Sequence, residues 1–163
     1  MAAINEFYCA ARRSQKLGIP LIPRLLECSI RILFQAAIPA RAQIAKSVFF
    51  HHSGLGVVIN GRSVIEEDCE IGVHVVLGGK APVVGAPYLE RGVIVHAGAK
   101  IIGPVRIGAG SVVAANAVVT TDMPANCLIA GVPAVVKRSG VDNSIYRHDA
   151  PPVASPSISA VNS

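Results

Sequence analysis

Two adjacent histidines are the residues of this chain best placed to do chemistry near neutral pH. His51 and His52 open the run HHSGLG, and three further histidines, His74, His96 and His148, stand singly along the chain. A neutral imidazole can remove the proton of an attacking hydroxyl group, because its usual pKa of about 6.5 leaves it mostly unprotonated at pH 7. The pair is therefore the first candidate for general-base catalysis.

The sequence around this pair has a six-residue period. Eleven aliphatic residues recur at six-residue intervals, namely Ile59, Ile65, Ile71, Leu77, Val83, Leu89, Val95, Ile101, Ile107, Val113 and Val119. An α-helix has a period of 3.6 residues and a strand a period of 2, so neither explains the spacing. A six-residue period is typical of a hexapeptide-repeat parallel β-helix, in which each repeat is a short strand and a tight turn with one aliphatic side chain directed inward.

Two irregularities interrupt this pattern. The run HHSGLG at 51–56 shifts the count by one residue, and an off-register insert in a solenoid bulges from the wall and can re-aim its side chains. Between Leu77 and Leu89 the count continues through Val83, but glycines and prolines predict a loop or a distorted corner. We expect the functional site at the first of these irregularities.

The chain divides into three predicted segments. Residues 1–43 form a short N-terminal α-helical cap, and residues 44–138 form the all-β core, the β-helix. Residues 139–163 contain Ser, Pro, Asn and Asp with little apolar pattern. This composition predicts a disordered tail, in which His148 is inert.

The predicted cap is basic and amphipathic. Residues 1–46 hold seven Lys or Arg and two acidic residues, which accounts for the whole net charge of +5. Asn5 is expected to cap a first helix that ends at Gly18, and a second helix is expected from about Pro23 to Ala37. We interpret these helices as a cover for the open end of the solenoid. The alternative is peripheral contact with a membrane surface through residues 1–40.

Composition narrows the partners and the compartment. Aromatic residues make up only 4% of the chain, whereas nucleic-acid binders often interleave aromatic with basic residues, so no nucleic acid is expected. No apolar run reaches the roughly 18 residues of a membrane span, and Met1–Leu17 lacks the apolar stretch of a signal peptide. Four cysteines without CxxC or zinc-ligand spacing predict reduced thiols in the cytoplasm.

Four segments resemble the serine acetyltransferase-like branch of the hexapeptide-repeat acyltransferases. They are FFHHSGLGVVINGRSVIEEDCEIG, LGG, GAKIIGPVRIGAGSVV and IAGVPAVV, and the resemblance covers about residues 42–138. It implies a left-handed parallel β-helix, a homotrimer, and a bacterial, acetyl-CoA-dependent O-acetyltransferase with its site in the cleft between neighbouring subunits. A histidine general base would activate an acceptor hydroxyl for direct attack on the thioester, without an acyl-enzyme.

Residue by residue, the resemblance places the general base on His52. The acidic residue that precedes the base in the family is His51 here, and a second, upstream acid aligns with Ala37. The family's second active-site histidine aligns with Ala86. Either His74 or His96 could replace it, and His96, beside Ala97, is the better candidate. These departures concern the acceptor side of the site.

On the acetyl-CoA side the resemblance is retained. Backbone groups that contact the pantetheine arm in the family fall on Gly79, Ala97 and Ala109. Lys137 and Arg138 stand where the phosphates of CoA are commonly met. The resemblance therefore implies acetyl-CoA as co-substrate.

The acceptor side leaves alternatives open. The acceptor is either serine or the hydroxyl of a sugar or polysaccharide precursor. The same departures leave open a non-catalytic trimeric scaffold that docks through its basic N-terminal helices. A zinc enzyme on this fold is disfavoured, because the histidine spacings offer no three obvious ligands, and no metal is expected.

Overall fold

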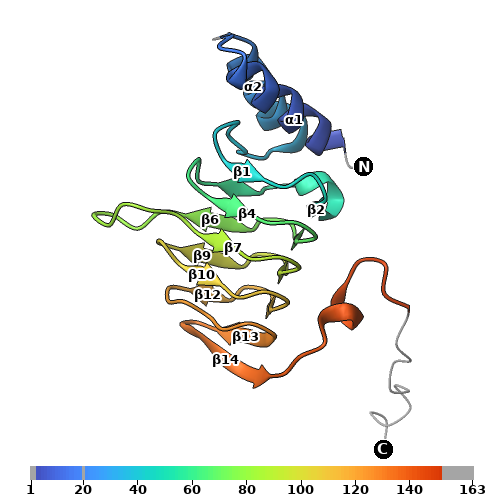
Figure 1. The fold of residues 1–163 in the computed structure, drawn as a ribbon, viewed down its shortest axis with the longest axis vertical. Coiled ribbons are helices and arrows are strands. Elements are labelled where there is room, and N and C mark those ends of the chain that lie inside the picture. Colours follow the sequence, from blue (N-terminus) through green and yellow to red (C-terminus); the bar gives the residue numbers. More distant parts are fainter. Residues whose placement is uncertain (1–2, 20, 152–163) are drawn as a thin grey trace, which may run out of the picture.

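The computed structural model describes residues 3–19 and 21–151 and shows a β-helix with two helices at its N-terminal end (Figure 1). The strands are β1 (Gln43–Ile44), β2 (Phe49–Phe50), β3 (Val58–Ile59), β4 (Val64–Ile65), β5 (Glu70–Ile71), β6 (Val76–Gly78), β7 (Tyr88–Leu89), β8 (Ile94–Val95), β9 (Lys100–Ile102), β10 (Arg106–Ile107), β11 (Val112–Val113), β12 (Val118–Val119), β13 (Cys127–Gly131) and β14 (Ala134–Ser139).

These strands form the three walls of a triangular solenoid. Sheet 1 has the order β1-β4-β7-β10, sheet 2 the order β2-β5-β8-β11-β13-β14, and sheet 3 the order β3-β6-β9-β12. All pairs are parallel except β13 with β14, which are antiparallel. The predicted left-handed parallel β-helix is confirmed, with about four coils.

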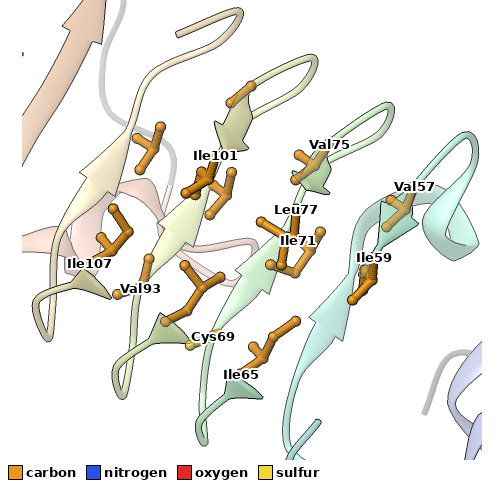
Figure 2. Close-up of a cluster of buried hydrophobic side chains, with 14 of the residues drawn as sticks. Val57, Ile59, Ile65, Cys69, Ile71, Val75, Leu77, Val93, Ile101 and Ile107 are labelled. Atoms are coloured by element: carbon orange, nitrogen blue, oxygen red, sulfur yellow. The ribbon is translucent and has the colours of Figure 1, made fainter. Parts of the chain in front are cut away.

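The six-residue count builds the core. Ten of its eleven aliphatic residues are buried, none more than 3% exposed. Residues at the same place in successive coils stack, as Ile59, Leu77 and Ile101 do on sheet 3 (Figure 2). Each fully buried aliphatic side chain stabilises the fold by about 1.5–3 kcal/mol, so the rungs hold the three corners in fixed register.

Val83 is the exception, and the reason is a loop. Ile59 and Leu77 are 18 residues apart, but Leu77 and its partner Ile101 are 24 apart. One hexad therefore leaves the wall between β6 and β7, where Val83 is 51% exposed. This is the loop expected from the glycines and prolines, and it projects from the solenoid in Figure 1.

The helices α1 (Ala3–Lys16) and α2 (Leu21–Phe34) pack on each other and on the first coil. Asn5 does not cap α1 as expected, because α1 begins before it; its side-chain amide donates instead to the carbonyl of Val48 at 2.8 Å. Ile4 and Ile30 join the solenoid core, so the helices do cover its open end. No helix in the described part of the chain is long and apolar enough to cross a membrane.

Residues 140–151, here called the C-terminal segment, differ from the expected disordered tail. They run along the solenoid and include a 3₁₀ turn at Asn143–Tyr146. The segment donates hydrogen bonds to carbonyls of three different coils, those of Asn126, Gly92 and Asp68. Exposed corner carbonyls supply these acceptors, which a reading of apolar pattern does not register. Residues 152–163 lie outside the described residues.

Candidate functional site

Four of the five histidines lie at one corner of the triangle, between sheets 2 and 3. His51 and His52 follow β2, His74 follows β5 and His96 follows β8. The parallel pairing of these three strands stacks the residues that follow them, although 45 positions separate His51 from His96. We call these four residues the histidine corner.

The register break gives the corner an unusual backbone. Residues 51–54 form a 3₁₀ turn in which His52 and Ser53 have φ of +47° and +57°. Left-handed backbone costs a non-glycine residue about 1 kcal/mol or more, and such strain clusters at functional sites. The His52 side chain is exposed and makes no hydrogen bond to any described residue. It is free to meet another molecule.

A buried carboxylate lies beside the corner. Glu70 is 0% exposed. Its Oε2 lies 3.0 Å from the Nε2 of His51 and accepts a hydrogen bond from the backbone N–H of His148 at 3.0 Å. Its Oε1 contacts the Nδ1 of His148 at 3.0 Å and the Nη2 of Arg147 at 3.3 Å. A buried charge is tolerated only when it is paired and hydrogen-bonded, which this one is.

Sequence reasoning missed Glu70, because it stands close to three other acidic residues, Glu66, Glu67 and Asp68, and such a run is typical of a solvated surface. One signal could have found it. Glu70 is aligned across sheet 2 with Phe49 and Ile94, which occupy the same position in neighbouring coils. A single acid in an otherwise apolar column marks a carboxylate that needs partners.

The C-terminal segment supplies those partners and covers sheet 2. The His148 ring stacks on Phe49, with ring centres 3.8 Å apart and planes 9° from parallel. The Tyr146 ring lies 6.2 Å from that of His96. Contrary to its predicted inert role, His148 shares a carboxylate with His51.

His96 is half-buried in this setting. Burial lowers its pKa from the usual value, and a positive charge on His51 lowers it further, while Glu70 opposes both. Desolvation disfavours the charged ring. His96 is therefore a neutral imidazole at pH 7.

Three side chains beside the histidine corner carry atoms of the kind that bind metal ions. Ligand atoms of Glu70, His148 and Asp149 lie within 4.8 Å of one another. Arg147 pairs with both of these carboxylates, at 3.3 Å and 3.7 Å. A guanidinium in this position supplies the positive charge that the two acids need.

The residues predicted to contact acetyl-CoA are not gathered within one chain. Gly79 lies in the loop after β6, Ala97 follows His96 at the histidine corner, and Ala109 follows β10 at the corner between sheets 1 and 2. Lys137 and Arg138 are exposed on β14, at the outer edge of sheet 2. Three different corners are thus involved.

The stacked counterpart of Ala97 is Ala115, which sequence reasoning missed. Strand register places Ala115 at the same corner one coil later, and the Asn116 N–H donates to the Ala97 carbonyl at 3.0 Å. The N–H groups of Ala97 and Ala115 make no hydrogen bond within the described residues. The N–H of Ala109 is already bound to Glu90 Oε2 at 2.7 Å.

A cavity lies away from the histidine corner. A cavity of about 780 Å³ between the helices and the first coil is lined by Arg24, Arg31 and Arg41, among others. Its acid, Glu27, accepts a hydrogen bond from the Ala40 N–H at 2.7 Å. Across the described ranges these three arginines form no ion pair. The cavity is therefore strongly basic.

Comparison with known sequences identifies the family to which the repeat is similar. Residues 86–121 match the bacterial transferase hexapeptide family (six repeats). The chain is 38% identical over 126 residues to a serine acetyltransferase of Synechococcus elongatus, a match that covers 76% of this chain and 51% of that protein. A serine acetyltransferase of Salmonella typhimurium is 35% identical over 120 residues, covering 72% and 44%. The chain spans about half the length of these curated relatives.

Solved structures agree with the sequence comparison. A serine acetyltransferase in complex with CoA superposes with a TM-score of 0.75 at 30% identity, covering 82% of this chain and 55% of that one. A serine acetyltransferase in complex with cysteine gives a TM-score of 0.80 at 28% identity, covering 86% and 56%. The chain therefore belongs to the hexapeptide-repeat acyltransferase superfamily, in its serine acetyltransferase-like branch.

Proposed function

We propose that this chain is an acetyl-CoA-dependent O-acetyltransferase that works as a homotrimer. The observation that carries the proposal is the histidine corner, where His52 lies at the same corner of the triangle as His96 and Ala97, and the Ala97 N–H makes no hydrogen bond within the described residues. The match to serine acetyltransferases over most of this chain supports the same reaction class. A cleft between copies would bring together corners that lie apart in one chain.

In the proposed reaction the acceptor oxygen attacks the thioester carbonyl of acetyl-CoA. His52 takes the hydroxyl proton as the carbon–oxygen bond forms, and a backbone N–H stabilises the negative charge on the carbonyl oxygen. Collapse of the tetrahedral intermediate breaks the carbon–sulfur bond. The CoA thiolate then leaves and takes up the proton from His52, which restores the neutral imidazole.

The N–H groups that lack a hydrogen-bond partner among the described residues favour one route for the pantetheine arm. Ala97 and Ala115 offer donors one coil apart at the histidine corner, whereas Ala109 offers none. We therefore place the arm along Ala97 and Ala115, with Gly79 contributed from a neighbouring copy. Lys137 and Arg138 are kept as the proposed phosphate contacts.

Serine is the first acceptor to test, because it is the substrate named for the relatives. Ala37 and Ala86, which stand where the family carries an acid and a histidine, have no polar side chain to hold it. The hydroxyl of a sugar or polysaccharide precursor is the second acceptor class.

The test is thiol release from acetyl-CoA in the presence of serine or nucleotide sugars. His52→Ala should lower the rate by at least about a hundredfold. The matched control is His74→Ala, at the same corner, whose ring packs against Gly56. Full activity of His52→Ala would refute the assignment of the base, and absence of thiol release with every acceptor would refute the proposed reaction.

A second candidate function rests on the helices. Exposed apolar residues of α2, namely Leu21, Leu25, Ile32 and Leu33, are 63–73% exposed. They accompany the arginine-lined cavity, so the pair of features fits an anionic membrane surface. Co-sedimentation with phosphatidylglycerol vesicles, but not phosphatidylcholine vesicles, would support it. Equal recovery with the two kinds of vesicle would contradict it. Unchanged vesicle binding by both Leu25→Glu and Arg24→Glu would also contradict it.

A further inference from the structure

We propose that Glu70 is the positioning residue of the histidine corner: it fixes the His51 ring in one tautomer and ties the C-terminal segment to the site. The kinetic consequence rests on the proposed acetyl transfer, whereas the tautomer does not. Neither the sequence pattern nor the resemblance assigns a role to Glu70.

The argument begins with a count of donors. An ionised carboxylate only accepts hydrogen bonds and offers about four lone-pair directions. Glu70 has four contacts, two on each oxygen: His51 Nε2 and the His148 N–H on Oε2, His148 Nδ1 and Arg147 Nη2 on Oε1. Every contacting nitrogen must therefore carry a hydrogen.

Charged and polar groups on several elements surround the Glu70 carboxylate. The Arg147 guanidinium stays protonated at any ordinary pH and offsets the buried carboxylate. The other titratable groups facing Glu70 are His51 from the end of β2, His148 from the segment, and His96 from the next coil. Asp149 also lies near Glu70, with ligand atoms of the two acids within 4.8 Å of each other; its side chain is mostly exposed and pairs with Arg147 at 3.7 Å.

The His51 tautomer follows from this count. With a hydrogen on Nε2, the neutral ring holds its lone pair on Nδ1, which makes no hydrogen bond within the described residues. The edge of this ring meets Phe49, with centres 5.0 Å apart and planes at 90°. Since the His51 side chain is 31% exposed, its Nδ1 is the atom left to accept a hydrogen bond from an acceptor hydroxyl.

The C-terminal segment is tied to the site by the same carboxylate. Arg147 and His148 reach Glu70 from 77 and 78 positions away in the sequence. His148 also covers Phe49, and Tyr146 lies beside His96. The segment therefore forms one side of the site and orients His51 through Glu70.

Two variants at position 70 separate positioning from folding. Glu70→Leu replaces the acid by an aliphatic residue, as found in the stacked positions Ile94 and Val112, so the solenoid should tolerate it. Glu70→Gln keeps the shape and removes the charge. Thermal melting of both variants verifies the fold.

The first readout is ¹⁵N NMR of the histidine rings in the full chain at pH 8, with His51 assigned from His51→Gln. The wild type should show His51 protonated on Nε2, and Glu70→Leu should show a mixture of tautomers. An Nδ1-protonated His51 in the wild type, or an unchanged His51 spectrum in Glu70→Leu, would overturn the proposal. This readout needs no activity, so it stands apart from failure of the proposed reaction.

The second readout is steady-state kinetics with an acceptor that supports thiol release. Both variants should lose at least about tenfold in kcat, in line with the larger loss seen when a carboxylate that orients a catalytic histidine is neutralised. KM for acetyl-CoA should not change.

The segment is tested by His148→Ala against Ile145→Ala, a matched change at a 56% exposed site in the same turn. His148→Ala should lower kcat about threefold or more, and Ile145→Ala should leave it unchanged. Wild-type kcat in Glu70→Leu, or equal effects of the two segment variants, would overturn the role of Glu70 as a positioning residue.

Discussion

Two valines at equivalent places in the six-residue count should differ sharply when truncated. Val95 is 1% exposed in a rung of the core, whereas Val83 is 51% exposed in the loop after β6. Replacing valine by alanine removes two methyl groups, worth about 0.8 kcal/mol each when buried, and leaves a cavity. Val95→Ala should therefore cost about 2–3 kcal/mol. Val83→Ala, like most surface changes, should cost no more than about 0.5 kcal/mol.

Thermal or urea unfolding at matched protein concentration measures the difference. For a chain of this size 1 kcal/mol corresponds to about 2–4 °C in Tm, so Val95→Ala should melt about 5–10 °C lower than the wild type. The Val83→Ala midpoint should stay within about 2 °C of it. Equal destabilisation of the two variants would refute the conclusion that the hexad at 79–84 has left the wall.

Three further predictions concern thiols, pH and the cofactor route. Burial raises the pKa of the Cys69 thiol to about 12. At pH 8 iodoacetamide should therefore label the exposed Cys28 and leave Cys69 unlabelled until the protein unfolds. Mass spectrometry of the labelled peptides measures this, and labelling of Cys69 before Cys28 would contradict the prediction. Burial lowers the pKa of His96 in the folded state, so the unfolded chain binds more protons there. The contribution of His96 to stability should be complete above about pH 6.5 and fall as pH drops below it. In His96→Gln the free energy of unfolding should fall less between pH 7 and pH 5.5 than in the wild type. An equal fall in the two proteins would contradict this prediction. Ala115→Glu should raise KM for acetyl-CoA at least about tenfold by placing a negative charge at the proposed pantetheine route, while Ala109→Glu should not; the reverse ranking would restore Ala109.

The sequence by itself determined the solenoid. An aliphatic residue every six positions specifies its own inward direction within one short strand and turn, so each rung is encoded locally. The run HHSGLG likewise predicted a bulge, and the glycines and prolines after Leu77 predicted a loop. These are short-range signals, and the coil repeats them often enough to be read.

Only the tertiary structure decided which corners and partners meet. The hexad lost to the loop changes the spacing of stacked residues from 18 between Ile59 and Leu77 to 24 between Leu77 and Ile101. Ala115 stacks on Ala97 because one full coil of 18 positions separates them, whereas Ala109 follows β10 at another corner. Glu70 and His148 are 78 positions apart, and a polar contact of that range leaves no period in the sequence. A buried carboxylate must nevertheless find donors, because its desolvation is too costly otherwise, and it is this requirement that fixes the C-terminal segment against the histidine corner.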